Sequence, residues 1–373
     1  MINNKKIMML ATTDNMIWQF LLPHIKYLQS QGNVVECVCA KTGFWFDELK
    51  DKYNLVCHEI PFKRNPFNFS TFKQFKQLKK LQKQEQYNLI YCQQPVGGVM
   101  GRMIAKKFKI PCLYTAHGFH FFKGNSGLKN FVFKSIEKHF AKYTDALVTI
   151  NQEDYEAALK FKAKHVYKIN GIGVDLSKYK VNKNLDKIAF KKSLGLNEND
   201  YVITSIGELN ENKNTLRLID VINKIKNQNI KYIICGRGSL EQKYKEQIEK
   251  YNLQDRVKLL GFRKDIPDIL TVTDLYIMPS YREGLSKSMM EAMCYGLPVV
   301  ASKIRGNVDL LGNNEGGILC DPTNNQDFVE AILTISNNPN YQKKLGTRNL
   351  EFIKNFDIKV VLNQLEEIYK EIE

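Results

Sequence analysis

Two glutamates eight residues apart, Glu283 and Glu291, stand in the most specific segment of the sequence, PSYREGLSKSMMEAMCYGLPVV. The segment lies between two short apolar runs, Leu275–Met278 and Pro298–Ala301, which are typical of buried strands. We expect a loop that carries Glu283, then a helix that Gly284 and its two successors open and that carries Glu291 two turns further on. Free backbone N–H groups at a helix start suit a phosphate, and carboxylates beside it suit hydroxyl groups. A nucleotide sugar has this layout, although a single helical glutamate is most often a solvated charge.

A second set of residues follows an earlier apolar run in the same half of the chain. Gly207 ends that run, and Lys213 lies six residues later, where a helix is expected to begin. A cation at this place could neutralise a departing diphosphate, although a lysine at a helix start usually means little. The glycine turn CGRGS, from Cys235 to Ser239, is too short to be a dinucleotide-binding fingerprint.

Polar residues in the first half of the chain also follow apolar runs. His117 comes two residues after the run Pro111–Thr115, and we expect it to point from a strand end into a ligand cleft. A structural hydrogen bond in a loop is the alternative for this histidine. Asp14 and Asn15 follow the first apolar run and are candidates to contact a sugar or an acceptor.

Short apolar runs alternate with stretches of helical periodicity along the chain, which indicates βαβ units and parallel sheets. The pattern restarts near residue 200, so we predict an α/β protein of two doubly wound Rossmann-like domains that face each other across a ligand cleft. The predicted domains are residues 1–172 and 173–356, and a final helix, 357–373, is free to pack back on the first domain. The predicted strands cover residues 7–11, 34–40, 55–60, 89–92, 111–115, 146–150, 166–169, 202–206, 231–235, 257–260, 275–278, 298–301 and 317–319. The predicted helices of the first half cover residues 18–31, 72–84, 98–108, 128–142 and 154–161.

The Glu283…Glu291 segment resembles the E-x7-E signature of the retaining glycosyltransferases of family 4, which have the GT-B fold. Other features agree in order: Gly207…Lys213, the segments CGRGSLE and LGFRKDIP, and the turn Gly316-Gly317. The resemblance covers essentially the whole chain and is strongest from about residue 200 to 335.

The resemblance implies roles for the matching residues. Glu291 would hold the ribose hydroxyls, Glu283 the hydroxyls of the donor sugar, and Lys213 the diphosphate, while His117 would lie near the donor sugar. The remaining donor-binding residues would be Gly207, the backbone N–H groups of Gly284, Leu285 and Ser286, and the backbone near Arg263. The expected catalytic residues are His117, Lys213 and Glu283.

The chain departs from the family pattern in two places. The family often has an arginine directly after the glycine of the first motif, where this chain has Glu208, so that Arg237, Arg282 or Lys213 would have to supply the charge. The usual glycine-rich loop after the first strand is also absent, which weakens a donor-phosphate role for that loop.

The charge of the chain is unevenly distributed. The formal net charge is +16, and residues 1–180 hold 28 Lys and Arg against 13 Asp and Glu. A basic half indicates an anionic partner such as an acidic membrane surface or nucleic acid; a general solubility bias is the alternative. Aromatic and basic residues alternate around Phe67 and Phe69 and again from His120 to Lys142, which suits peripheral docking on lipid. No apolar stretch is long enough to span a bilayer.

We therefore expect a retaining enzyme that transfers a hexose or N-acetylhexosamine from a nucleotide sugar, with UDP as the expected nucleotide. The expected acceptor is a lipid-linked glycan in cell-surface polysaccharide synthesis. The resemblance implies that cations such as Lys213 and a helix start stabilise the diphosphate instead of a metal. No Asp-x-Asp is present, so no metal or cofactor is expected. Scattered single cysteines favour a reducing compartment, so we place the enzyme in the cytoplasm, on the inner face of the cell membrane. The alternatives are a UDP-sugar 2-epimerase of the same fold and a basic nucleic-acid-binding protein.

Overall fold

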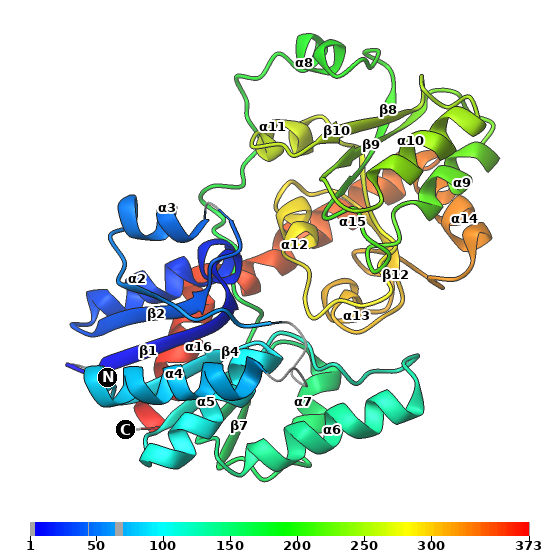
Figure 1. Ribbon diagram of the computed structural model, residues 1–373. Coiled ribbons are helices and arrows are strands. Elements are labelled where there is room, and N and C mark those ends of the chain that lie inside the picture. The colour runs from blue at the N-terminus through cyan, green and yellow to red at the C-terminus, as the bar shows by residue number, and fades with distance from the viewer. Residues whose placement is uncertain (1–3, 44, 64–69, 373) are drawn as a thin grey trace. The chain divides into compact units, whose positions relative to one another are not determined.

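The chain forms two compact units in this computed structural model, which describes residues 4–43, 45–63 and 70–372 (Figure 1). The first unit contains the chain up to Gly173 together with the residues from Ile358 onward, and the second runs from Val174 to Asp357. The chain thus passes between the units at two neighbouring points, and a parallel bridge pairs Val174 with Asp357 where the second unit begins and ends.

The first unit is built on a parallel sheet of seven strands in the order β3-β2-β1-β4-β5-β6-β7. Its connections run outward in opposite directions from β1 and β4, which makes it a doubly wound sheet with a switch point between these two strands. Its strands are β1 (Lys6–Thr13), β2 (Val34–Ala40), β3 (Cys57–Glu59), β4 (Leu89–Gln93), β5 (Cys112–Ala116), β6 (Ala146–Thr149) and β7 (His165–Lys168).

Helices connect these strands, as the alternation of apolar runs and helical periodicity predicts. They are α1 (Asp14–Met16), α2 (Leu22–Ser30), α3 (Trp45–Asp51), α4 (Ser70–Glu85), α5 (Pro95–Phe108), α6 (Gly127–Ala141) and α7 (Gln152–Ala158). A π-helical turn, Ile17–Leu21, joins α1 to α2. Pro23 follows this turn and has no N–H to continue an α-helical ladder, which helps the irregular turn to persist.

The last helix, α16 (Ile358–Glu371), belongs to the first unit and lies against α2, as Figure 1 shows in red beside blue. Its buried residues Val361, Leu365 and Ile368 recur at intervals of four and three, as one packed helix face requires. Tyr27 of α2 donates a hydrogen bond from its hydroxyl to Glu366 Oε2 over 2.6 Å.

The second unit repeats the architecture with a parallel sheet of six strands in the order β10-β9-β8-β11-β12-β13. Its switch point lies between β8 and β11. The strands are β8 (Tyr201–Ile206), β9 (Ile230–Cys235), β10 (Val257–Gly261), β11 (Leu275–Met278), β12 (Val299–Ser302) and β13 (Gly317–Cys320). The helices are α8 (Lys187–Ser193), α9 (Arg217–Lys224), α10 (Glu241–Lys250), α11 (Ile266–Thr271), α12 (Lys287–Cys294), α13 (Asn307–Leu311), α14 (Asn325–Ser336) and α15 (Pro339–Phe352).

The predicted fold class is confirmed, and each predicted strand corresponds to an observed one. The ends differ by a few residues, most of all at β3, where only Cys57–Glu59 of the predicted residues 55–60 pair with β2. Leu55 and Ile60 are buried and apolar, so hydrophobicity alone extends the prediction beyond the paired residues. No helix in the described ranges has the length and apolar character needed to cross a bilayer.

Candidate active site

The loops that follow β8 and β11 meet at the switch point of the second unit. Because β8 and β11 are neighbours and their connections leave in opposite directions, a crevice is expected at their carboxyl ends. Lys213, from the first loop, donates from Nζ to Oε1 of Glu283, from the second, over 2.7 Å. Two residues that the sequence singled out separately are therefore in direct contact.

Hydrogen bonds to backbone carbonyl oxygens hold the two loops together. Tyr281 N donates to the carbonyl oxygen of Asn212 over 2.8 Å, and Asn212 Nδ2 donates to the carbonyl oxygen of Arg282 over 2.9 Å. Asn214 Nδ2 bridges to the carbonyl oxygen of Pro279 over 3.0 Å. Asn214 has a φ of 55°, a left-handed conformation that asparagine tolerates better than most residues. These contacts position Lys213 beside Glu283.

Helix α12 begins at Lys287, and Ser286 is its N-cap. The Ser286 hydroxyl accepts from Met289 N over 3.3 Å, as serine at this position commonly does. Gly284 and Leu285 therefore lie in the loop ahead of the helix, and the prediction that they open it is wrong. The cap displaces the helix start because its side chain competes for the first backbone N–H groups.

Glu291 lies in the second turn of α12 and is 8% exposed. Its Oε1 accepts a hydrogen bond from the Tyr179 hydroxyl over 2.6 Å and lies 3.8 Å from Nζ of Lys287. Burial raises the pKa of Glu291, whereas the contacts with Lys287 and Tyr179 lower it. This buried carboxylate thus has partners, which removes the largest cost of placing a charge there.

Arg305 is a candidate site residue that the sequence analysis did not identify. It follows β12, is 6% exposed, and donates from Nε to the carbonyl oxygen of Glu283 over 3.3 Å. The pKa of Arg282 is lowered by burial and by the positive charge of Arg305, so two guanidinium groups lie close to the Glu283 loop. The signal in the sequence was a cation followed by Gly306, directly after a buried strand.

Gly306 explains how the Arg305 loop comes so close. Its φ is +76°, and a Cβ atom at this position would lie 2.2 Å from the carbonyl oxygen of Gly284. Any larger residue would push the two backbones apart, since the clash is with main chain. The glycine thus allows the loops after β11 and β12 to touch at the same edge of the sheet.

The other candidate donor-binding residues lie at the same edge. Gly207 N donates to the carbonyl oxygen of Cys235 over 2.9 Å, so the turn after β8 packs on the glycine turn after β9. Arg263, just beyond β10, forms a two-pronged ion pair with Asp265, in which Nε donates to Oδ1 over 2.8 Å. Its side chain is thus engaged by Asp265, and the role of the backbone near Arg263 stays a prediction.

His117, at the end of β5 in the first unit, is half-buried and its Nε2 lies 2.7 Å from Gln93 Oε1. Burial, with a smaller contribution from His24, lowers the pKa of His117 to about 3. The imidazole is therefore neutral near neutral pH. It can exchange hydrogen bonds with a hydroxyl group, but it is a weak base.

Asp14 is fully buried at the start of α1, where both of its carboxylate oxygens are used inside the fold. Oδ1 accepts from Asn15 N over 2.8 Å and from the Thr42 hydroxyl, and Oδ2 accepts from Thr42 N over 3.1 Å. These contacts tie the ends of β1 and β2 together. His120 is half-buried, and its ring lies 5.3 Å from that of Phe133. Phe67 and Phe69 lie outside the described residues.

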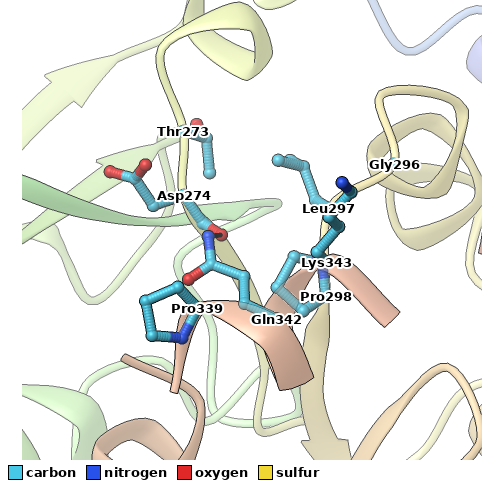
Figure 2. A pocket seen from close by; sticks show the side chains of 8 residues that line it. All are labelled: Thr273, Asp274, Gly296, Leu297, Pro298, Pro339, Gln342 and Lys343. Atoms are coloured by element: carbon cyan, nitrogen blue, oxygen red, sulfur yellow. Dashed lines mark hydrogen bonds between the residues drawn. The ribbon is translucent and has the colours of Figure 1, made fainter. Parts of the chain in front are cut away.

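A pocket of about 290 Å³ in the second unit lies away from these residues (Figure 2). Thr273 and Asp274 precede β11, and Gly296, Leu297 and Pro298 precede β12, so the pocket lies at the amino ends of these strands. The candidate site is at the opposite, carboxyl edge, and this pocket is no part of it. Within the described ranges, no three His, Cys, Asp or Glu side chains gather as a metal site would require.

The sequence and the fold are similar to those of known glycosyltransferases. The family described as "Glycosyl transferases group 1" matches residues 186–352, and the family "Glycosyl transferase 4-like" matches residues 6–151. EpsD of Bacillus subtilis (strain 168), a protein named as a glycosyltransferase, is 30% identical over 98% of this chain and 96% of its own. The UDP-Gal:alpha-D-GlcNAc-diphosphoundecaprenol alpha-1,3-galactosyltransferase of Escherichia coli is 30% identical over 93% of this chain and 92% of its own.

Among solved structures, Anabaena HepE in complex with UDP superimposes with a TM-score of 0.82 at 22% identity, covering 98% of this chain and 99% of that one. This likeness confirms the GT-B fold. Two relatives that match over nearly the whole chain are named as glycosyltransferases, which favours this class of enzyme over the epimerase and nucleic-acid-binding alternatives. By sequence match over nearly its full length, this chain belongs to the group 1, family 4-like glycosyltransferases.

Proposed function

We propose that this enzyme transfers a hexose or N-acetylhexosamine from a UDP-sugar to a hydroxyl group of a lipid-linked glycan, with retention of the anomeric configuration. The sugar C1–O bond to the diphosphate breaks, a new C1–O bond forms to the acceptor oxygen, and the acceptor proton is released. Two relatives support the substrate classes: the E. coli galactosyltransferase is named for a UDP-sugar donor and a diphosphoundecaprenol acceptor, and HepE was crystallised with UDP-glucose. CapM of Staphylococcus aureus is named for capsular polysaccharide biosynthesis.

The observation that carries the proposal is the contact between Lys213 and Glu283 at the sheet edge where Glu291 also lies. In the proposed complex, Lys213 binds the diphosphate and stabilises the charge that develops on it as the bond breaks. Glu283 binds hydroxyls of the donor sugar, and Glu291 binds the ribose hydroxyls. The N–H groups of the Gly284–Ser286 loop contact phosphate oxygens.

The remaining predicted residues receive roles by the resemblance. The backbone near Arg263 contacts the nucleobase, and neutral His117 exchanges hydrogen bonds with the donor sugar. Asp14 acts indirectly in this scheme, since its carboxylate holds the loops after β1 and β2. Arg305 adds positive charge beside Glu283. Such a charge matters in this chain because Glu208 stands where the family often has an arginine.

The acceptor part of the proposal places the enzyme on an anionic membrane surface. Three apolar side chains in the first two turns of α4 and α6 are strongly exposed: Phe72 (78%), Leu128 (76%) and Phe131 (71%). Both helices follow the carboxyl ends of strands and carry exposed lysines, such as Lys73, Lys76, Lys129 and Lys134. Aromatic rings beside cations suit the headgroup region of a bilayer, where a lipid-linked acceptor is held.

A binding panel followed by a transfer assay tests the proposal. UDP-, GDP- and ADP-sugars are screened by thermal shift, because a ligand that binds the folded state raises its apparent stability. The UDP-sugars that bind are then incubated with GlcNAc-diphosphoundecaprenol, and a product heavier by one sugar is sought by mass spectrometry. Donor alone is the control. Stabilisation by UDP-sugars and transfer to the lipid support the proposal; a folded protein that no UDP-sugar stabilises contradicts it.

A further inference from the structure

The Glu291 carboxylate is held by a residue that lies outside the signature segment. Tyr179 precedes Glu291 by 112 positions, and its hydroxyl donates to Glu291 Oε1 over 2.6 Å. We infer that Tyr179 is a positioning residue for the nucleotide: its hydroxyl fixes one oxygen of the Glu291 carboxylate so that the other faces the ribose hydroxyls. The inference rests on the proposed function, in which Glu291 binds the ribose.

A local turn just before Tyr179 helps to position its hydroxyl group. Asp175 Oδ1 accepts hydrogen bonds from the backbone N–H of Ser177, over 3.0 Å, and from its hydroxyl, over 2.5 Å. This local turn reverses the chain soon after the second unit begins at Val174. The Tyr179 ring packs on the hydrophobic cluster that includes the apolar residues of α12 around Glu291. Ring and turn are thus fixed, and little conformational freedom remains to be lost when the hydroxyl binds its partner.

The contacts of the carboxylate are one-sided. The Tyr179 hydroxyl and the Lys287 ammonium, 3.8 Å away, both lie against Oε1. In the described part of the chain, the contacts found for this carboxylate both involve Oε1, and we assign Oε2 to the ligand. A carboxylate that accepts through Oε2 alone would otherwise rotate, and the short bond from Tyr179 prevents this rotation.

The same hydrogen bond affects the ionisation of Glu291. Burial raises the pKa of this carboxyl group, and Lys287 and Tyr179 act against burial. The other titratable groups that interact with it are neutral at physiological pH: the buried Tyr276, Cys294 and Tyr295. Without the Tyr179 hydroxyl the pKa of Glu291 is higher. Because the ionised form accepts the stronger hydrogen bonds, affinity for the ribose is then lost at a higher pH as the solution is acidified.

The test compares three single variants of the full chain in calorimetric titrations with UDP over a pH series. Tyr179→Phe keeps the packed ring and removes only the hydroxyl. Glu291→Gln keeps the shape of the side chain but cannot ionise, so it reports the pH dependence that comes from UDP itself. Tyr232→Phe is the matched control, because Tyr232 is a fully buried tyrosine of the same unit whose hydroxyl bonds to Ser205 instead, over 2.7 Å.

We expect Tyr179→Phe to weaken UDP binding about tenfold, because the carboxylate that Tyr179 no longer fixes must be ordered when it binds the ribose. Its affinity should also begin to fall at a higher pH than that of the parent. Tyr232→Phe should match the parent in both respects. Tyr179→Phe should lower the affinity for 2′-deoxy-UDP and 3′-deoxy-UDP less than the affinity for UDP, because these ligands already lack one of the hydroxyl groups that Glu291 binds.

The outcomes separate the inference from the proposed function. If Glu291→Gln binds UDP as tightly as the parent, Glu291 does not hold the ribose, and the proposed role and the inference fail together. If Glu291→Gln loses affinity while Tyr179→Phe matches Tyr232→Phe in affinity and pH profile, only the inference is overturned. A loss in Tyr179→Phe without any shift of its pH profile also overturns it, since a merely structural defect would give that result.

Discussion

The ion pair between Lys213 and Glu283 gives the sharpest prediction. Their side chains are 23% and 12% exposed, and their charged atoms are 2.7 Å apart. At an effective dielectric constant of about 20, the attraction across this distance is about 6 kcal/mol. Residual hydration and the ordering of two long side chains offset most of it, so that Lys213→Ala should lower the free energy of unfolding by only about 1–2 kcal/mol.

The same substitution should have a larger effect on turnover. A diphosphate bound at Lys213 competes with Glu283 for the ammonium group, and its demand for positive charge is greatest as the sugar leaves. The interaction is therefore stronger in the transition state than with the bound donor, and its loss appears mainly in kcat. By comparison with the removal of one oxyanion donor, the barrier should rise by about 3–4 kcal/mol, or about 10²–10³-fold in rate.

The assay is the initial rate of sugar transfer, with UDP affinity and melting temperature measured on the same preparations. Lys231→Ala is the matched control, because Lys231 on β9 is also a partly buried lysine near a carboxylate, 3.9 Å from Asp200. It lies at the amino end of its strand, on the opposite edge of the sheet from Lys213. Its substitution should affect stability and leave turnover nearly unchanged. A folded Lys213→Ala enzyme with the turnover of Lys231→Ala would refute the role of Lys213.

Three further predictions concern other parts of the molecule. Arg305→Ala should weaken UDP binding about tenfold, and Arg305→Lys should recover part of it, as calorimetry would show; equal affinity of parent and alanine variant would exclude a role in binding the anion. Because the folded protein holds His117 at a pKa of about 3 and an unfolded histidine titrates near 6.5, the unfolded state binds the extra proton, and stability should fall as the pH drops between these values. His117→Gln should reduce this pH dependence of the free energy of unfolding, measured by urea unfolding. The reduction is partial, since buried His24 also has a lowered pKa, and an unchanged pH dependence would contradict the assignment. When the exposed Phe72, Leu128 and Phe131 are replaced by serine, the fraction of protein that sediments with anionic vesicles should decrease several-fold. The protein should not sediment with neutral vesicles.

The fold could be predicted because its signals are local. Most strands are short apolar runs that are buried on both faces of a parallel sheet, although the edge strands β3 and β7 are only partly buried. The connections between strands show helical periodicity. Strand β11 is observed with the predicted bounds, Leu275–Met278. The residue at which a helix begins depends on which side chain binds the first free backbone N–H groups. In α12 this is Ser286, two residues after the glycine that was expected to open the helix.

The site could be predicted only where residue types recur at a fixed spacing. Glu283 and Glu291 belong to one segment, and Lys213 follows a strand end, so each of them could be found from the sequence. Their contact, and the positions of Arg305 and Tyr179, depend on which strands are neighbours in the sheet and on where the linking segment passes. Sequence spacing carries no such information, because residues far apart in the chain meet through topology.

The position of Arg305 suggests how the chain works with Glu208 in place of the usual arginine. Glu208 is exposed just after β8, so it adds negative charge at the edge where the proposed diphosphate binds. Lys213 alone would offset this poorly, because Glu283 shares its charge. Arg305 donates from Nε to the carbonyl oxygen of Glu283, so its guanidinium group lies beside the Lys213–Glu283 ion pair. A cation moved from the end of β8 to the end of β12 still lies at the same sheet edge, and Gly306 permits the close approach of loops that this move requires. We therefore propose that Arg305, after β12, supplies positive charge that the family often places directly after the glycine that ends β8.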